Sequence, residues 1–456
     1  MSGVASARRR RRQAGAALFL VSFALVQALL WYAYYAHGAK ALIGDEQSYQ
    51  QAALAILAGG PWMASTIWPP LQPLLLAAVY GIAGVHLLAA QLVQGVLFVL
   101  CGVLLRDLWR RLGGSVRAAN GAAALFLLDP STAAYAQWLW PEVPHLFLLL
   151  AALCLLARTA PPLRAGAAGA CVGLAILAKS LLAAFWPVPL LVFVRRARPH
   201  LATRAAAAYV AALALVTAPA LVHGWREYGR PMIADSSVYN LWIGLTDQWR
   251  SDYIGDMGGI TLPAFLASGA TPQARNAVYL DKVRALVDAR GAGTLLADQL
   301  GRQYFRLFSA KTPLLSQLPG AACAGHLSAY RTPLWLTRTL TVASDLAHAL
   351  ILAAAAFGLA RWRRRGERGV QALWLLLALF AAYQLALFAF IHVKARFLLP
   401  LLPFAGGFAA DVLCERRGDA VLAPASPSRL VLGALLAALL LGLAFGGPLL
   451  DHACAA

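Results

Sequence analysis

The sequence predicts an all-α polytopic membrane protein, and three features of the chain lead to that prediction. Of its 456 residues, 61% are hydrophobic and only 13% are charged, which is too apolar for a soluble domain of this length. The apolar residues come in runs of about 20, the length that a helix needs to cross the hydrocarbon core of a bilayer. Between these runs the arginines gather in short clusters. The net charge of +20 therefore follows the positive-inside pattern of cytoplasmic loops and does not indicate a nucleic-acid surface.

The arginine clusters set the expected topology, with the N-terminus inside the cell and the C-terminus outside. The first apolar stretch is longer than a signal h-region, so we interpret it as a retained helix. Residues 69–84 are also apolar, but a full span there would put an arginine cluster on the wrong side. We therefore expect them either at the membrane surface or as a broken extension of the second helix. About eleven spanning helices remain, expected at residues 14–36, 86–105, 118–134, 143–158, 165–179, 181–195, 203–222, 337–360, 370–391, 397–414 and 429–450.

Two segments on the expected outer side divide the chain. A short loop covers residues 37–70, and a long loop covers residues 223–336 and holds eight of the nineteen acidic residues. Apolar residues recur every three or four positions between Thr294 and Phe308, which predicts an amphipathic helix. We therefore expect an N-terminal transmembrane module with the first loop (1–222), a periplasmic loop (223–336) and C-terminal transmembrane helices (337–456).

Acidic residues at the outer ends of the predicted helices are the first candidates for chemistry. Asp45 and Glu46 follow the first span, and Tyr49 lies one helical turn after Asp45. Asp45 is either a helix N-cap or a carboxylate that accepts a proton from an attacking hydroxyl at the membrane surface. Asp129 and Glu142 flank the short outer turn between the third and fourth spans. Each is either a helix-terminal acid or a functional acid at the membrane edge.

Cations on the outer side are the second group of candidates, because the positive-inside rule disfavours them there. His392, Lys394 and Arg396 lie between the ninth and tenth spans, and Lys179 lies at the outer end of an apolar hairpin. These side chains either extend along the bilayer to reach headgroups or bind an anionic phosphate where water is scarce.

A mixed aromatic and amide run from Tyr239 to Gly244 opens the long loop. Asn240 and Trp242 within it suit a sugar or headgroup surface, although many loops share this composition. The six cysteines show no CxxC or Cys/His ligand spacing, so the sequence predicts no zinc site. Cys323 and Cys454 both fall on the expected outer side, and their spacing leaves open whether they form a disulfide.

In their order along the chain, these segments resemble the GT-C glycosyltransferases, in particular bacterial relatives of the dolichyl-phosphate-mannose protein mannosyltransferases (glycosyltransferase family 39) and of the lipid A aminoarabinose transferase. The resemblance runs from about residue 14 to about residue 414. Phe397 stands where relatives often have Tyr, and Leu245-Thr246-Asp247 stands where many have Asn-Asn-Pro. The motifs that carry the resemblance are Asp45-Glu46 with Tyr49 and Ala53, Pro69 to Leu74, Glu142, Asn240 to Gly244, and Arg396 to Pro403.

The resemblance implies a GT-C-like helical bundle in the bacterial inner membrane that faces the periplasm. It implies inverting transfer from a polyprenyl-phosphate sugar donor to a glycan, lipid or protein acceptor, with no metal or other cofactor. Its implied catalytic residues are Asp45 and Glu46. The predicted substrate-binding residues within the matching motifs are Tyr49, Glu142, Asn240, Trp242 and Arg396. Lys179, His392 and Lys394 are predicted to bind substrate because of their position on the outer side.

The second interpretation of the sequence is a polysaccharide polymerase or ligase with periplasmic arginines, or a non-enzymatic membrane assembly factor. Such a protein does not need the Asp45-Glu46 pair directly after its first helix. A transporter is the third. Transporters carry internal repeats and polar residues near the membrane midplane, whereas the spans here are almost uncharged and show no repeat.

Overall fold

The computed structural model of the chain describes residues 2–36, 38–63, 65–158, 161–196, 199–246, 257–310, 315, 317–320, 330–363, 368–415 and 422–446. Over these ranges the regular elements are helices, without any strand, so the predicted all-α class is confirmed. Six described helices are long and apolar enough to cross a membrane, as expected of a multi-pass membrane protein. They are α1 (Ser2–Tyr35), α4 (Leu87–Arg111), α10 (Pro199–Tyr228), α16 (Leu334–Ala360), α17 (Arg368–Leu387) and α19 (Pro427–Leu441), which a π-helical turn extends to Gly446.

The predicted count of eleven spans is not confirmed, because several apolar runs form shorter or broken helices. One pair, Pro130–Gln137 and Glu142–Leu156, bends by 110° and makes a seventh span if it is counted as one. Prolines account for these breaks, since proline removes a backbone donor and disfavours a helix before it. Pro130 follows the end of α5, and Pro187 and Pro189 precede α9. The short elements are α5 (Val116–Leu128), α6 (Pro130–Ala134), η1 (Tyr135–Gln137), α7 (Glu142–Leu156), α8 (Pro162–Ala178), η2 (Ser180–Leu182), α9 (Leu190–Arg196), η4 (Ala395–Leu398) and α18 (Leu402–Leu413).

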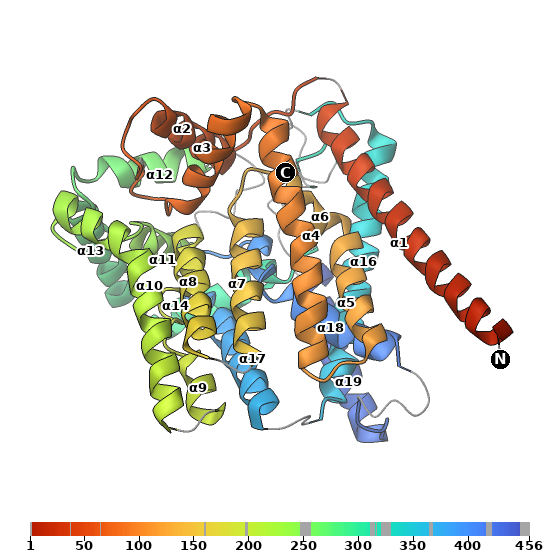
Figure 1. Cartoon of the computed structure of the whole chain (residues 1–456). Coiled ribbons are helices and arrows are strands. Elements are labelled where there is room, and N and C mark those ends of the chain that lie inside the picture. Colours follow the sequence, from red (N-terminus) through yellow and green to blue (C-terminus); the bar gives the residue numbers. More distant parts are fainter. Residues whose placement is uncertain are drawn as a thin grey trace.

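Short helices gather at one end of the bundle, the end at which α1 finishes. Figure 1 shows α2 (Asp45–Leu57), α3 (Leu71–Ala83) and α12 (Met257–Ala267) there, at the top of the view, with α9 at the opposite end. The long loop also forms α11 (Ser237–Thr246), α13 (Pro272–Arg290), α14 (Ala292–Arg302) and η3 (Tyr304–Leu307). The predicted amphipathic helix is confirmed as α14, which buries Leu295 and ends at Arg302 before η3.

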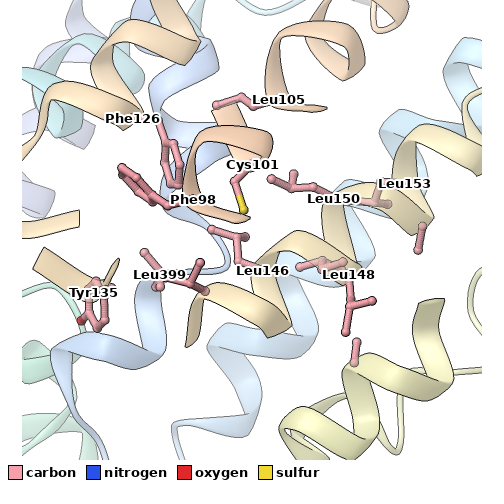
Figure 2. Packing of buried hydrophobic residues seen from close by; sticks show 14 of the residues in the cluster. Phe98, Cys101, Leu105, Phe126, Tyr135, Leu146, Leu148, Leu150, Leu153 and Leu399 are labelled. Carbon is pink, nitrogen blue, oxygen red and sulfur yellow. The ribbon is translucent and has the colours of Figure 1, made fainter. Parts of the chain in front are cut away.

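The centre of the bundle is built where α4 packs against α5 and α7. The rings of Phe98 and Phe126 lie 5.0 Å apart, and Figure 2 shows them beside Cys101 and Leu146. Small residues let other helices approach closely. A Cβ on Gly169 of α8, for example, would lie 2.1 Å from the backbone oxygen of Tyr209 in α10. This tight packing fixes α7 and α8, whose ends near α2 carry charged residues.

Candidate active site

Four charged side chains from distant parts of the chain meet at the α2 end of the bundle. Arg396 Nη2 donates a hydrogen bond to Asp45 Oδ2 at 2.8 Å, and its Nε lies 3.7 Å from Glu142 Oε1. Lys179 Nζ donates to the same Glu142 oxygen at 3.0 Å. We call these four residues the charged cluster. The structure thus brings together two predicted acids and two predicted cations.

Each residue of the cluster lies at the end of an element. Asp45 is the first residue of α2, and Glu142 is the first residue of α7. Lys179 directly follows α8, and Arg396 lies in η4. Residues at element ends can project charged side chains away from the apolar helix packing, so none of the four charges lies in the middle of a helix.

The interpretation of Asp45 as an N-cap is wrong. Gly44 occupies the cap position of α2, with a φ of 58° that suits glycine, and no side chain caps this helix end. Asp45 therefore follows the cap, and its carboxylate pairs with Arg396 instead of with the helix backbone.

Aromatic rings line the two cations. The Arg396 guanidinium lies 4.6 Å from the centre of the Trp140 ring and 5.5 Å from that of Phe397. Lys179 Nζ lies 5.0 Å from the centre of the Phe397 ring. Cation–π contacts of this kind hold a cation while leaving its N–H groups available. Trp140 was not predicted as a site residue, although it stands two positions before Glu142.

Several buried polar atoms of the site have no hydrogen-bond partner among the described residues. They are Glu142 Oε2, Trp140 Nε1 and Arg396 Nε. An unpaired buried donor or acceptor costs about 1–3 kcal/mol. One unpaired acceptor beside two unpaired donors therefore suits a ligand that carries both hydroxyl groups and anionic oxygens.

Tyr49 and Lys394 stand close to the cluster. Burial raises the pKa of Tyr49, and the carboxylates of Asp45 and Glu142 raise it further, which places the phenol near both acids. Its ring packs edge-on against Trp68, 6.1 Å between centres. The Tyr49 side chain therefore lies beside Asp45.

Asp45 is held in its ionised form. Burial alone would raise the pKa of its carboxyl group, but Arg396 and then Lys394 outweigh that effect. The pKa therefore lies below the ordinary value of 3.8. Asp45 is a carboxylate throughout the neutral pH range.

The run that opens the long loop packs against the segment leading to Arg396. The backbone N–H of His392 donates to the carbonyl oxygen of Asn240 at 3.0 Å. A Cβ on Gly244 would lie only 2.7 Å from the backbone of Ile391, so glycine permits this close approach. The two predicted motifs are thus joined, but through backbone groups.

The side chains of Asn240, Trp242 and His392 contribute no charge to the cluster. Asn240 Nδ2 donates to the backbone oxygen of Ser236, the residue before α11, at 2.7 Å, and Trp242 packs against Tyr279, 6.0 Å between ring centres. Burial lowers the pKa of His392 well below 6.5, and Lys394 and other nearby cations lower it further. His392 is therefore neutral at pH 7 and is not one of the cations.

Two other predicted acids are bonded within the protein. Glu46 is fully buried and accepts hydrogen bonds from Lys40 Nζ at 2.6 and 2.7 Å and from the Leu139 N–H at 2.9 Å. Asp129 caps α6, and its carboxylate accepts from the Thr132 N–H at 2.9 Å. The geometry favours a structural role for both acids. The nearby Lys40, six residues before Glu46 in the sequence, could have indicated that Glu46 forms a buried ion pair.

The predictions about metal ligands and cysteines concern the described residues only in part. The described residues contain no group of three or more His, Cys, Asp or Glu side chains that could hold a metal ion. Cys323 and Cys454 lie outside the described residues.

Comparison with known proteins gives matches among solved structures alone. No family model and no curated protein matches the sequence. The oligosaccharyltransferase AglB from Archaeoglobus fulgidus, solved with an inhibitory peptide and a dolichol-phosphate, is 13% identical, with a TM-score of 0.49 over 96% of this chain and 55% of its own. ArnT from Cupriavidus metallidurans, bound to undecaprenyl phosphate, is 17% identical, with a TM-score of 0.39 over 88% of this chain and 78% of its own.

The chain therefore spans little more than half the length of the archaeal protein. Both solved structures are at most 17% identical to this chain, with TM-scores of at most 0.49. Their overall similarity to this chain is low, and the function proposed below rests on the residues of the charged cluster.

Proposed function

We propose that this protein is a membrane glycosyltransferase that moves a sugar from a polyprenyl-phosphate donor to an acceptor on the periplasmic side of the bacterial inner membrane. The observation that carries the proposal is the charged cluster. Two carboxylates and two cations meet at one end of an apolar bundle, beside buried polar atoms that have no partner among the described residues. A lipid-linked sugar phosphate has the hydroxyls, the anionic oxygens and the apolar tail to fit such a place.

Arg396 and Lys179 would bind the donor phosphate. The charge on the phosphate oxygens grows as the bond to the sugar breaks, so fixed cations stabilise the transition state more than the bound donor. The planar guanidinium of Arg396 can grip two phosphate oxygens at once. Lys394, which already acts on Asp45 electrostatically, would add a weaker attraction.

Asp45 would act as the general base. It takes the proton from the acceptor hydroxyl while the acceptor oxygen bonds to the anomeric carbon, and the electron pair of the broken bond stays on the phosphate. Exposure separates the two acids, since the Asp45 side chain is 30% exposed and the Glu142 side chain 3%. Asp45 is open to an incoming acceptor, whereas the enclosed Glu142 is suited to holding Lys179 and a sugar hydroxyl.

A lipid-binding measurement tests the proposal directly. Purified protein in nanodiscs should bind undecaprenyl phosphate, and Arg396→Ala should weaken that binding at least tenfold. Arg284→Ala is the matched control, because Arg284 lies on α13 with a 72% exposed side chain. Equal binding by wild type and Arg396→Ala would reject the phosphate site. Mass spectrometry of periplasmic glycans and glycolipids after gene deletion would then name the sugar and its acceptor.

The periplasmic orientation is tested by labelling single cysteines in a cysteine-free background. The arginine distribution places α13 outside and the start of α10 inside. We expect an impermeant maleimide to label Asp281→Cys in intact cells, and Arg204→Cys only after the inner membrane is opened. The reverse pattern would overturn the orientation.

A further inference from the structure

A non-helical segment lies inside the bundle next to the charged cluster. Residues 138–140 lie between η1 and Pro141, which precedes α7, and the two helical parts make an angle of 110°. Trp138, Leu139 and Trp140 are all buried. The end of a helix leaves carbonyl groups without backbone partners. Within a membrane bundle, water is not at hand to satisfy them, so other protein groups must do so.

Glutamine side chains supply the missing donors. Three consecutive carbonyl oxygens, one from the last residue of η1 and two from the segment, each accept a hydrogen bond from a buried glutamine amide. The three glutamines are 0–4% exposed. Two of them stand three positions apart on α4 and share one helix face, and the third lies in the first turn of α3. The pairs are Gln91 to Gln137 at 2.7 Å, Gln94 to Trp138, and Gln72 to Leu139 at 2.9 Å.

The same segment is tied to the start of α2. The N–H of Leu139 donates to Glu46 Oε1 at 2.9 Å, and Glu46 is the neighbour of Asp45. Immediately after the held carbonyls come Trp140, which faces the Arg396 guanidinium, and Glu142, which pairs with Lys179. The position of the segment therefore sets the distance between Asp45 and Glu142, the two acids of the charged cluster.

We propose that Gln72, Gln91 and Gln94 are positioning residues that hold residues 138–140 extended, so that Trp140 and Glu142 meet the cations of the cluster. A buried glutamine need not do this. Gln384 of α17 is 1% exposed, and neither its side-chain nitrogen nor its oxygen has a partner among the described residues. The expected effect of these glutamines on sugar transfer rests on the proposed function, whereas their expected effect on the position of Trp140 does not.

The geometry is tested by 19F NMR on protein that contains 5-fluorotryptophan, with the Trp140 signal assigned through Trp140→Phe. Methionine keeps the unbranched shape of glutamine and removes its donor. Gln94→Met and Gln72→Met should shift or broaden the Trp140 resonance, while the control Gln384→Met leaves it in place. Transfer should fall roughly ten- to hundredfold in the first two variants and stay unchanged in the control.

An unmoved Trp140 resonance in folded Gln94→Met and Gln72→Met would overturn the proposal. A moved resonance in a protein that neither binds undecaprenyl phosphate nor transfers sugar would support the positioning role and reject the proposed function. If the variants do not fold, hydrogen exchange in the wild-type protein decides the matter. The Leu139 amide should exchange slowly although it lies outside any helix, and exchange within seconds would contradict the proposal.

Discussion

The substitution Asp45→Asn separates catalysis from folding, because the two losses differ in size. Asn keeps the shape of the side chain but loses the charge that pairs with Arg396. The paired side chains are 30% and 14% exposed, so their ion pair contributes about 1 kcal/mol. The favourable position at the start of α2 contributes about 0.3–1 kcal/mol. Since Asp45 caps nothing, no further loss follows, and stability should fall by only about 1–2 kcal/mol.

The loss in catalysis should be larger. A general base contributes roughly 10²- to 10⁴-fold in rate, which corresponds to about 3–5 kcal/mol of transition-state stabilisation. The assay is the initial rate of sugar transfer from a polyprenyl-phosphate sugar, with thermal unfolding measured on the same preparation. Asp281→Asn is the control, because Asp281 forms only an exposed pair within α13. A folded Asp45→Asn protein with the wild-type rate would refute the role of Asp45 as the base.

Three further predictions concern the same residues. Arg396→Lys should slow transfer and weaken lipid-phosphate binding although the charge is kept, and Arg396→Ala should have a larger effect. Unchanged rate and affinity in Arg396→Lys would instead indicate that the Arg396 side chain only extends to the lipid headgroups. Glu46→Gln should lower stability by about 3–5 kcal/mol, because it leaves the buried ammonium of Lys40 without its partner, and thermal unfolding should show recovery when Lys40→Met is added. The pKa of Asp45 is depressed, so the stability from its ion pair is complete above pH 3.8 and is lost as the pH falls through the lower pKa of the folded state. Transfer should likewise persist in mild acid. In Arg396→Ala, the pH–rate profile should lose activity at a higher pH than in the wild type.

The fold class followed from composition and from the length of the apolar runs, but the helix breaks did not. A hydropathy window averages over a proline, so residues 118–134 looked like one span, although Pro130 separates α5 from α6. The short helices around residues 180–196 have the same cause. Lipid requires backbone groups to be satisfied, yet side chains can satisfy them in place of a continuous helix. The glutamines of α3 and α4 do this for residues 138–140, and no apolar window registers them.

The members of the charged cluster could be predicted one by one, but their contacts could not. Asp45 and Arg396 are 351 positions apart, and topology placed them only on the same side of the membrane. Asp45 and Glu46 were both predicted as catalytic residues, with Asp45 as the base. Neighbouring residues of a helix point about 100° apart, so Asp45 reaches Arg396 while Glu46 reaches Lys40. A pattern of residue types cannot show which of two adjacent acids faces the open side.

The ion pair between Asp45 and Arg396 bears on the order of events in the proposed reaction. A carboxylate whose pKa is held down by Arg396 is a weak base. A donor phosphate that draws Arg396 away from Asp45 removes that influence, and the pKa of Asp45 then rises toward the range in which it accepts a proton more readily. Lys179, which pairs with Glu142 at 3.0 Å, would be drawn toward the phosphate in the same way. In the proposed reaction, donor binding would therefore activate the base, so the donor should bind before the acceptor is deprotonated.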